Sequence, residues 1–157
     1  MNHITLRNFL LDTLATLRAV HWHAWTLHWK TQGSTYYSDH LLFQRLYSGD
    51  QGGPDINAQI DGLGERIVAL YGAAAIDESF IERRVVELLD GSRAKSENEP
   101  IKQAQVLETY LLQVVTQAAG QAAGLPASYS VALDNYLRAI ADERSTVSYL
   151  LGQRLGK

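Results

Sequence analysis

Apolar residues recur every three or four positions along most of this chain, which is the period of amphipathic helices. Between residues 4 and 31 the apolar positions are Ile4, Leu6, Phe9, Leu10, Leu14, Leu17, Val20 and Leu27. At 1.5 Å per residue, a helix over this stretch is about 40 Å long, a length that suits a bundle of long helices. Gly33 is placed to end this helix, and Ser34 is placed to cap the next one.

The second predicted helix is interrupted. It runs over residues 34–47, and the eight residues SGDQGGPD at 48–55 then break the helical pattern because they are rich in turn formers. Pro54 suits the first position of a restarted helix, with Asp55 in its first turn. The restarted helix ends at Gly72.

The second half of the chain predicts two further long helices. A short helix around 78–89 is followed by a polar connector at 91–100, and the third long helix covers about 101–120. After the loop AAGLPAS, Ser128 or Ser130 caps a fourth helix that ends near Arg154. The predicted fold class is all-α: four long helices with a short extra helix between the second and third, in a single domain over residues 1–157.

Composition narrows the chemistry that this bundle can carry. The chain has no cysteine, so a metal site must use nitrogen and oxygen ligands. A formal net charge of −3 argues against a general nucleic-acid binder. No apolar run approaches the ~20 residues that a membrane span needs. The N-terminal MNHITLRNFLLD lacks the pattern of a secretory signal, so we expect a cytoplasmic protein.

The candidate chemistry lies between residues 28 and 66. All five histidines fall in the first 40 residues, and His28 and His40 are placed to meet across a short turn between antiparallel helices. Asp61 and Glu65 stand at i and i+4, on one face of a helix. Imidazole and carboxylate together suit Fe(II) or Zn(II). The alternative is a solvated acidic face beside Arg66, with histidines that only pack or cap.

Several motifs in this region resemble the Dps family of mini-ferritins, within the ferritin-like superfamily. They are HWKTQG at 28–33, His40 with Phe43 and Leu46-Tyr47, DGLGERIVAL at 61–70, and IDESFIERR at 76–84. The resemblance covers most of the chain in its helical pattern, although the specific motifs are concentrated in 28–84. It implies a ferritin-like four-helix bundle, in which the segment 76–84 belongs to the short extra helix.

The resemblance also implies a function and a site. In that family a ferroxidase centre lies at a two-fold interface, which would place His28 and His40 on one subunit and Asp61 and Glu65 on its partner, with Trp29 beside them. The implied activity is oxidation of Fe(II) by hydrogen peroxide or oxygen at a mono-iron or di-iron site. The Fe(III) would be stored in a hollow homo-oligomer, a dodecamer, which protects against oxidative stress. Some members bind DNA through basic tails, but Arg7 is the only basic residue among the first seventeen here.

Two departures from the family pattern keep an alternative open. Gln44 follows Phe43, where the family commonly has Asp or Glu; it is counted here as a fifth candidate ligand, although a neutral amide is a weaker ligand for a hard cation. The break at 48–55 also lengthens the connection between His40 and Asp61. The alternative function is therefore a structural or interaction protein with the same bundle and a weakened or lost metal site, or one that binds zinc without redox chemistry.

The other histidines and the tryptophans have less specific expectations. His21 shares the helix face of His28 two turns earlier, so it is a polar interface residue or an extra ligand. His23 points elsewhere and is expected in solvent. Trp22, Trp25 and Trp29 are expected to be core and interface anchors.

Overall fold

The computed structural model describes residues 5–97 and 99–157, and its regular elements in these ranges are all helices, without a β-strand. The elements are α1 (Leu6–Lys30), α2 (Tyr36–Arg45), η1 (Gly49–Gln51), α3 (Ile56–Tyr71), η2 (Ala73–Ala75), α4 (Glu78–Lys95), α5 (Pro100–Ala122) and α6 (Ala127–Arg154). The start of the first helix, predicted at residue 4, lies outside the described residues.

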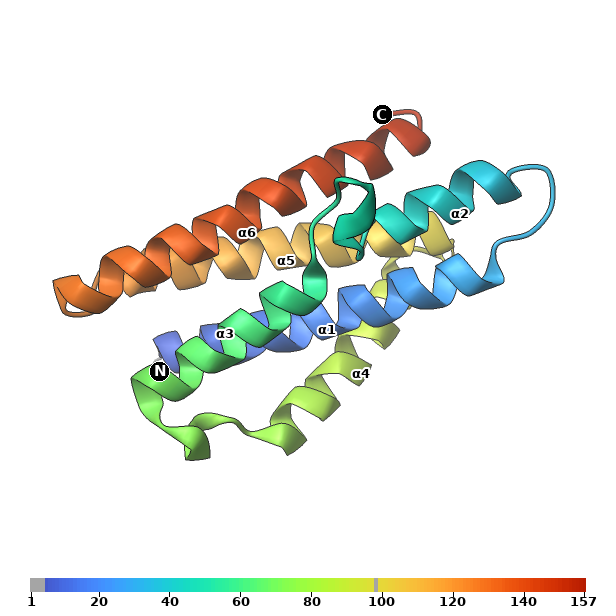
Figure 1. Cartoon of the computed structure of the whole chain (residues 1–157). Coiled ribbons are helices and arrows are strands. Elements are labelled where there is room, and N and C mark those ends of the chain that lie inside the picture. Colours follow the sequence, from blue (N-terminus) through green and yellow to red (C-terminus); the bar gives the residue numbers. More distant parts are fainter. Residues whose placement is uncertain (1–4, 98) are drawn as a thin grey trace.

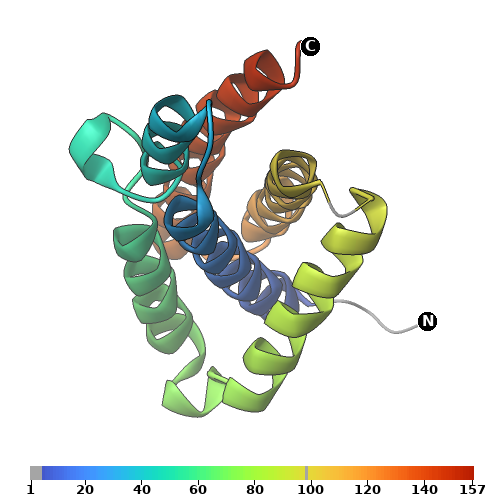
Figure 2. The same cartoon turned by 90° about the vertical axis from the view of Figure 1, so that its right-hand side faces the viewer.

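The long helices lie side by side and form a bundle (Figure 1). Helices α1, α5 and α6 are three of them, and α2 with α3 follows α1 as the interrupted fourth helix. The additional helix α4 packs against α1 and α5, on the opposite side of the bundle from the η1 loop (Figure 2). The predicted all-α class, with its four-helix bundle and extra helix between the second and third long helices, is confirmed. None of the helices in the described ranges combines the length and apolar character needed to cross a membrane.

Residues 48–55 form a loop that projects sideways between α2 and α3. The backbone N–H of Ile56 donates to the carbonyl oxygen of Tyr47, which closes the loop at its base. Within the loop, Ser48 Oγ accepts a hydrogen bond from the N–H of Asp50, and Gly52 adopts a left-handed backbone with φ of +69°. A Cβ on Gly53 would lie 2.1 Å from the carbonyl oxygen of Arg45, so only glycine fits where the loop returns to the helix.

Several predicted helix ends are wrong by a few residues. Asp55, predicted inside the first turn of α3, is its N-cap: its Oδ1 accepts from the N–H groups of Asn57 and Ala58, at 3.1 Å each. A carboxylate in this position pairs two N–H groups that the helix leaves free, so the helix begins at Ile56 and not at Pro54. Thr35, not Ser34, stands at the N-cap of α2.

Two further helix ends also differ from their predicted positions. Helix α4 continues to Lys95, into the first half of the connector predicted at 91–100, where Ser92 and Ser96 are buried. Gln103 of α5 also donates to the Leu89 carbonyl and to Ser92 Oγ, at 3.0 Å each. Helix α6 begins at Ala127 behind Pro126, so Ser128 and Ser130 lie inside the helix and not at its cap.

The buried apolar residues form two clusters. The main one fills the bundle between α1, α3, α4, α5 and α6. A second, which we call the α2 cluster, consists of Ala24, Leu27, Phe43, Leu46, Ala104, Val147 and Leu151. It is the α2 cluster that seats the helix carrying His40.

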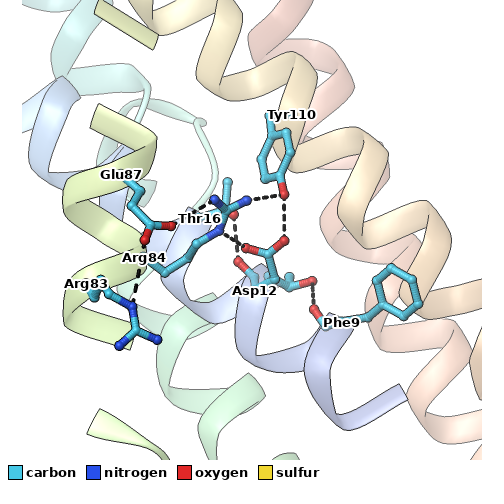
Figure 3. A network of polar contacts seen from close by, with 8 residues as sticks. Phe9, Asp12, Thr16, Arg83, Arg84, Glu87 and Tyr110 are labelled. Atoms are coloured by element: carbon cyan, nitrogen blue, oxygen red, sulfur yellow. Dashed lines mark hydrogen bonds and ion pairs between the residues drawn. The ribbon is translucent and has the colours of Figure 1, made fainter. Parts of the chain in front are cut away.

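A polar network ties α4 to the bundle (Figure 3). Asp12 Oδ1 accepts from Arg84 Nε at 2.7 Å, and Asp12 Oδ2 accepts from the Tyr110 hydroxyl at 2.6 Å. The Arg84 guanidinium also donates to Tyr110 and to Glu87. The network joins α1, α4 and α5, and it fixes the extra helix by directional bonds as well as by apolar contact.

Candidate metal centre

His28 and His40 form a stacked pair. His28 lies in the last turn of α1, His40 lies in α2, and residues 31–35 join the two helices. The ring centroids are 3.8 Å apart, and the ring planes are inclined by 28°. The predicted meeting of these two histidines is therefore present within one chain.

Reciprocal hydrogen bonds determine which ring nitrogen carries the proton in each histidine of the pair. His28 Nδ1 lies 3.1 Å from the carbonyl oxygen of His40, and His40 Nδ1 lies 3.1 Å from the carbonyl oxygen of His28. A carbonyl oxygen can only accept, so both Nδ1 atoms must be the protonated donors. In the neutral rings the lone pair is then on Nε2, which is the arrangement that a backbone carbonyl imposes on metal-binding histidines. Each of the two half-buried imidazoles thus has an Nε2 lone pair that its backbone bond does not use.

Aromatic side chains surround the pair. The ring of Tyr36 stacks on His40 with centroids 5.1 Å apart, and Tyr47 meets His28 edge-on at 5.9 Å. His21 lies beside Tyr47 at 5.7 Å, and burial lowers the pKa of His21 and raises that of the Tyr47 phenol. The packing of Tyr36 and Tyr47 against the histidine pair was not predicted from the sequence, although the i, i+4 spacing of Tyr36 and His40 could have indicated the stacking.

Asp61 and Glu65 lie on α3, and both are exposed. Burial is the main cause that raises the pKa of the Tyr136 phenol, and Arg66, stacked over the Tyr136 ring, lowers it. The negative charges of Asp61 and Glu65 add smaller increases to this pKa. Within residues 5–97 and 99–157, no three His, Cys, Asp or Glu residues of one chain gather closely enough to hold a metal ion. The structure therefore brings His28 and His40 together but does not join them to Asp61 and Glu65 in the same subunit.

Gln44 lies one turn after His40 on α2 and is half-buried. An i, i+4 spacing puts the two side chains on the same face of that helix. Gln44 is thus a neighbour of the histidine pair along α2.

The sequence-based expectations about α1 need correction for His23 and, in part, for the tryptophans. His23 was expected in solvent, but it is buried, and its Nε2 lies 3.1 Å from the carbonyl oxygen of Pro100. Trp22, Trp25 and Trp29 were expected to be core and interface anchors; all three are exposed in the single chain, so none lies in the core, and an interface role stays a prediction. Trp22 and Trp29 meet edge to face at 6.2 Å. Helix α1 packs against helices on several sides, so its buried face is wider than a single apolar stripe. His23 lies within this wider face and is therefore buried.

Comparison with known proteins identifies the fold. No protein-family model matches the chain, and no curated protein matches its sequence. The X-ray structure of Dps from Thermosynechococcus elongatus superposes with a TM-score of 0.71, over 98% of this chain and 94% of that one, at 20% sequence identity. The chain therefore has the fold of that Dps structure, a ferritin-like four-helix bundle, as its motifs predicted.

Proposed function

We propose that this chain is a Dps-like mini-ferritin that binds and oxidises Fe(II) at a site shared between two subunits. The single domain would assemble as a hollow homo-oligomer, a dodecamer, in which Fe(III) is stored. The observation that carries the proposal is the His28–His40 pair, whose reciprocal Nδ1 bonds leave both Nε2 atoms free to bind a cation.

The donor set fits iron as a substrate. The two Nε2 atoms would come from one subunit, and Asp61 and Glu65 from the second. Both carboxylates are exposed in the single chain, so they are open to another subunit. Nitrogen and oxygen ligands together suit Fe(II), and carboxylates favour the harder Fe(III) that oxidation produces. With peroxide as oxidant, two Fe(II), one H₂O₂ and two protons give two Fe(III) and two waters.

A second candidate is favoured by Gln44. Its amide cannot supply the negative charge of a carboxylate beside His40, which lowers the expected affinity for a hard cation. The site would then bind zinc without redox chemistry, or it would have lost its metal function, and the protein would act as a structural or interaction protein.

Ferric absorbance after addition of Fe(II) and peroxide tests the activity. We expect rapid oxidation by the wild type and a rate near that of protein-free solution for His28→Ala and for Asp61→Ala. Asp90→Ala is the matched control, because Asp90 is an exposed carboxylate on α4 paired with Arg93. Equal rates for all four proteins would reject the ferroxidase function.

Mixing the two inactive variants tests the sharing of the site. If each site takes His28 from one subunit and Asp61 from the other, a mixed two-fold dimer holds one intact site and one with both lesions. Random reassembly would then restore about a quarter of the sites. No recovery in a mixture that light scattering shows to have reassembled would reject the shared site, and a monomeric wild type would reject the shell.

A further inference from the structure

Helix α6 presents one stripe of side chains to α2. The stripe consists of Arg144, Val147, Leu151 and Arg154, spaced by three, four and three residues, so that they lie along one face of α6. It is apolar in the middle and has an arginine at each end.

The middle of the stripe seats α2 through apolar contacts. Val147 and Leu151 belong to the α2 cluster, where they are buried together with Phe43 and Leu46. This packing fixes which face of α2 turns inward. It leaves the ends of α2 to be fixed by other contacts.

Arg154 holds the first half of α2. Its Nε and one terminal nitrogen donate to the two carboxylate oxygens of Asp39, at 2.8 and 3.0 Å. Asp39 is only 6% exposed and directly precedes His40. A bidentate contact of this kind fixes the orientation of the two side chains as well as the distance between them.

Arg144 holds the other end. Its side chain is fully buried and donates to the carbonyl oxygen of Leu46, the C-cap of α2, at 3.0 Å. The carbonyls of the last helical turn lack partners in their own helix, so this bond supplies one of them. Glu108 pairs with the rest of the guanidinium and balances the buried charge.

Helix α2 depends on its tertiary contacts because it would not be stable on its own. It has ten residues, fewer than a helix needs for stability on its own. Its N-cap residue, Thr35, makes no side-chain capping bond, and the excursion at 48–55 separates it from α3.

We propose that Arg144 and Arg154 are positioning residues: by holding the two ends of α2, they keep His40 where it can exchange hydrogen bonds with His28. The metal-binding consequence rests on the proposed function, but the effect on the histidine pair does not. Neither arginine is assigned a contact with the metal.

Arg154→Ala, with Arg138→Ala as the matched control, tests the outer contact. Arg138 lies on the same helix, is exposed, and pairs with Asp134 at 2.8 Å without touching α2. The first measurement is made on metal-free protein: ¹⁵N NMR of the histidine rings reports which nitrogen carries the proton. We expect wild type and Arg138→Ala to show Nδ1–H for His28 and His40, and Arg154→Ala to show a mixture of tautomers. Arg154→Lys should restore the wild-type state in part.

The second measurement is Co(II) binding, followed by visible absorption. We expect Arg154→Ala to weaken Co(II) binding by about fivefold, as for loss of a partly exposed ion pair, with Arg138→Ala unchanged. For the buried end, the double variant Arg144→Met/Glu108→Leu removes the contact to Leu46 without leaving a buried charge, and it should give the same mixture of tautomers.

The outcomes separate the two proposals. Pure Nδ1–H tautomers in both Arg154→Ala and the folded double variant would overturn the positioning role. A wild type that binds no Co(II), but whose tautomers respond to Arg154→Ala, would reject the proposed function and retain the positioning role.

Discussion

His28 and His40 each donate a hydrogen bond from Nδ1 to the backbone carbonyl of the other, at 3.1 Å in both directions. The pair joins the last turn of α1 to α2 and at the same time orients two Nε2 lone pairs. His40 Nδ1 thereby caps a carbonyl of the last turn of α1, and the proposed ligand role would use the Nε2 atoms that this capping leaves available.

Gln44→Glu should raise the initial rate of Fe(II) oxidation several-fold. The substitution adds a carboxylate one turn from His40, which strengthens binding of a hard cation. Stopped-flow ferric absorbance measures the rate, with Gln113→Glu, on an exposed position of α5, as the control for added charge. An unchanged rate would show that a ligand at position 44 does not limit the reaction.

Two glycines of α3 should respond to alanine with opposite signs. A Cβ on Gly62 would lie 2.6 Å from the Tyr136 hydroxyl, which donates to the carbonyl oxygen of Gln59, whereas a Cβ on Gly64 meets nothing within 4 Å. Gly62→Ala should destabilise the fold by about 1–2 kcal/mol, because it displaces Tyr136. Gly64→Ala should stabilise it by about 0.5–1 kcal/mol through helix propensity. Urea unfolding measures both, and a shift of the same sign in the two variants would contradict the described packing.

His23 should make the fold less stable in mild acid. Burial is the main cause that lowers the pKa of His23 below its usual value near 6.5. The unfolded chain therefore takes up a proton at a higher pH than the folded one. This contribution to stability is complete above pH 6.5 and is lost as the pH falls through 6.5 towards the lower folded value.

His23→Leu isolates this contribution. The variant should show a smaller loss of stability than the wild type between pH 7.5 and pH 5, measured as the difference in urea midpoints at the two pH values. The lowered pKa of His21 contributes equally to both proteins and cancels in the comparison. Parallel pH profiles would show that His23 is protonated as easily in the folded state as in the unfolded one.

Tyr110→Phe should cost about 1–2 kcal/mol of stability, because Asp12 and Arg84 lose the hydroxyl between them. Burial also raises the pKa of the Tyr110 phenol, so the folded state keeps a proton that the unfolded state has lost. The wild type should therefore lose more stability than the variant above pH 10. Tyr149→Phe is the control, since Tyr149 is 63% exposed and should change the urea midpoint little.

The sequence by itself determined the class of the fold and the candidate residues of the site. The spacing of apolar residues predicts helices because a helix buries one face whatever its partners are. The turn formers at 48–55 likewise predict the interruption, since glycine and proline act locally. The motifs at 28–33 and 61–70 pointed to the fold of Dps proteins, and the structural comparison confirmed that fold.

Only the tertiary structure decided the tautomers of His28 and His40, the burial of His23 and the support of α2 by α6. Each of these depends on atoms that are distant in the chain: the His40 carbonyl beside His28, the Pro100 carbonyl beside His23, and two arginines more than ninety residues after α2. The C-terminal end of α4 also depends on tertiary packing, since α4 continues through polar residues that are buried against α5. Local sequence sets which helix a residue belongs to, whereas the partners of its polar atoms are set by how the helices pack.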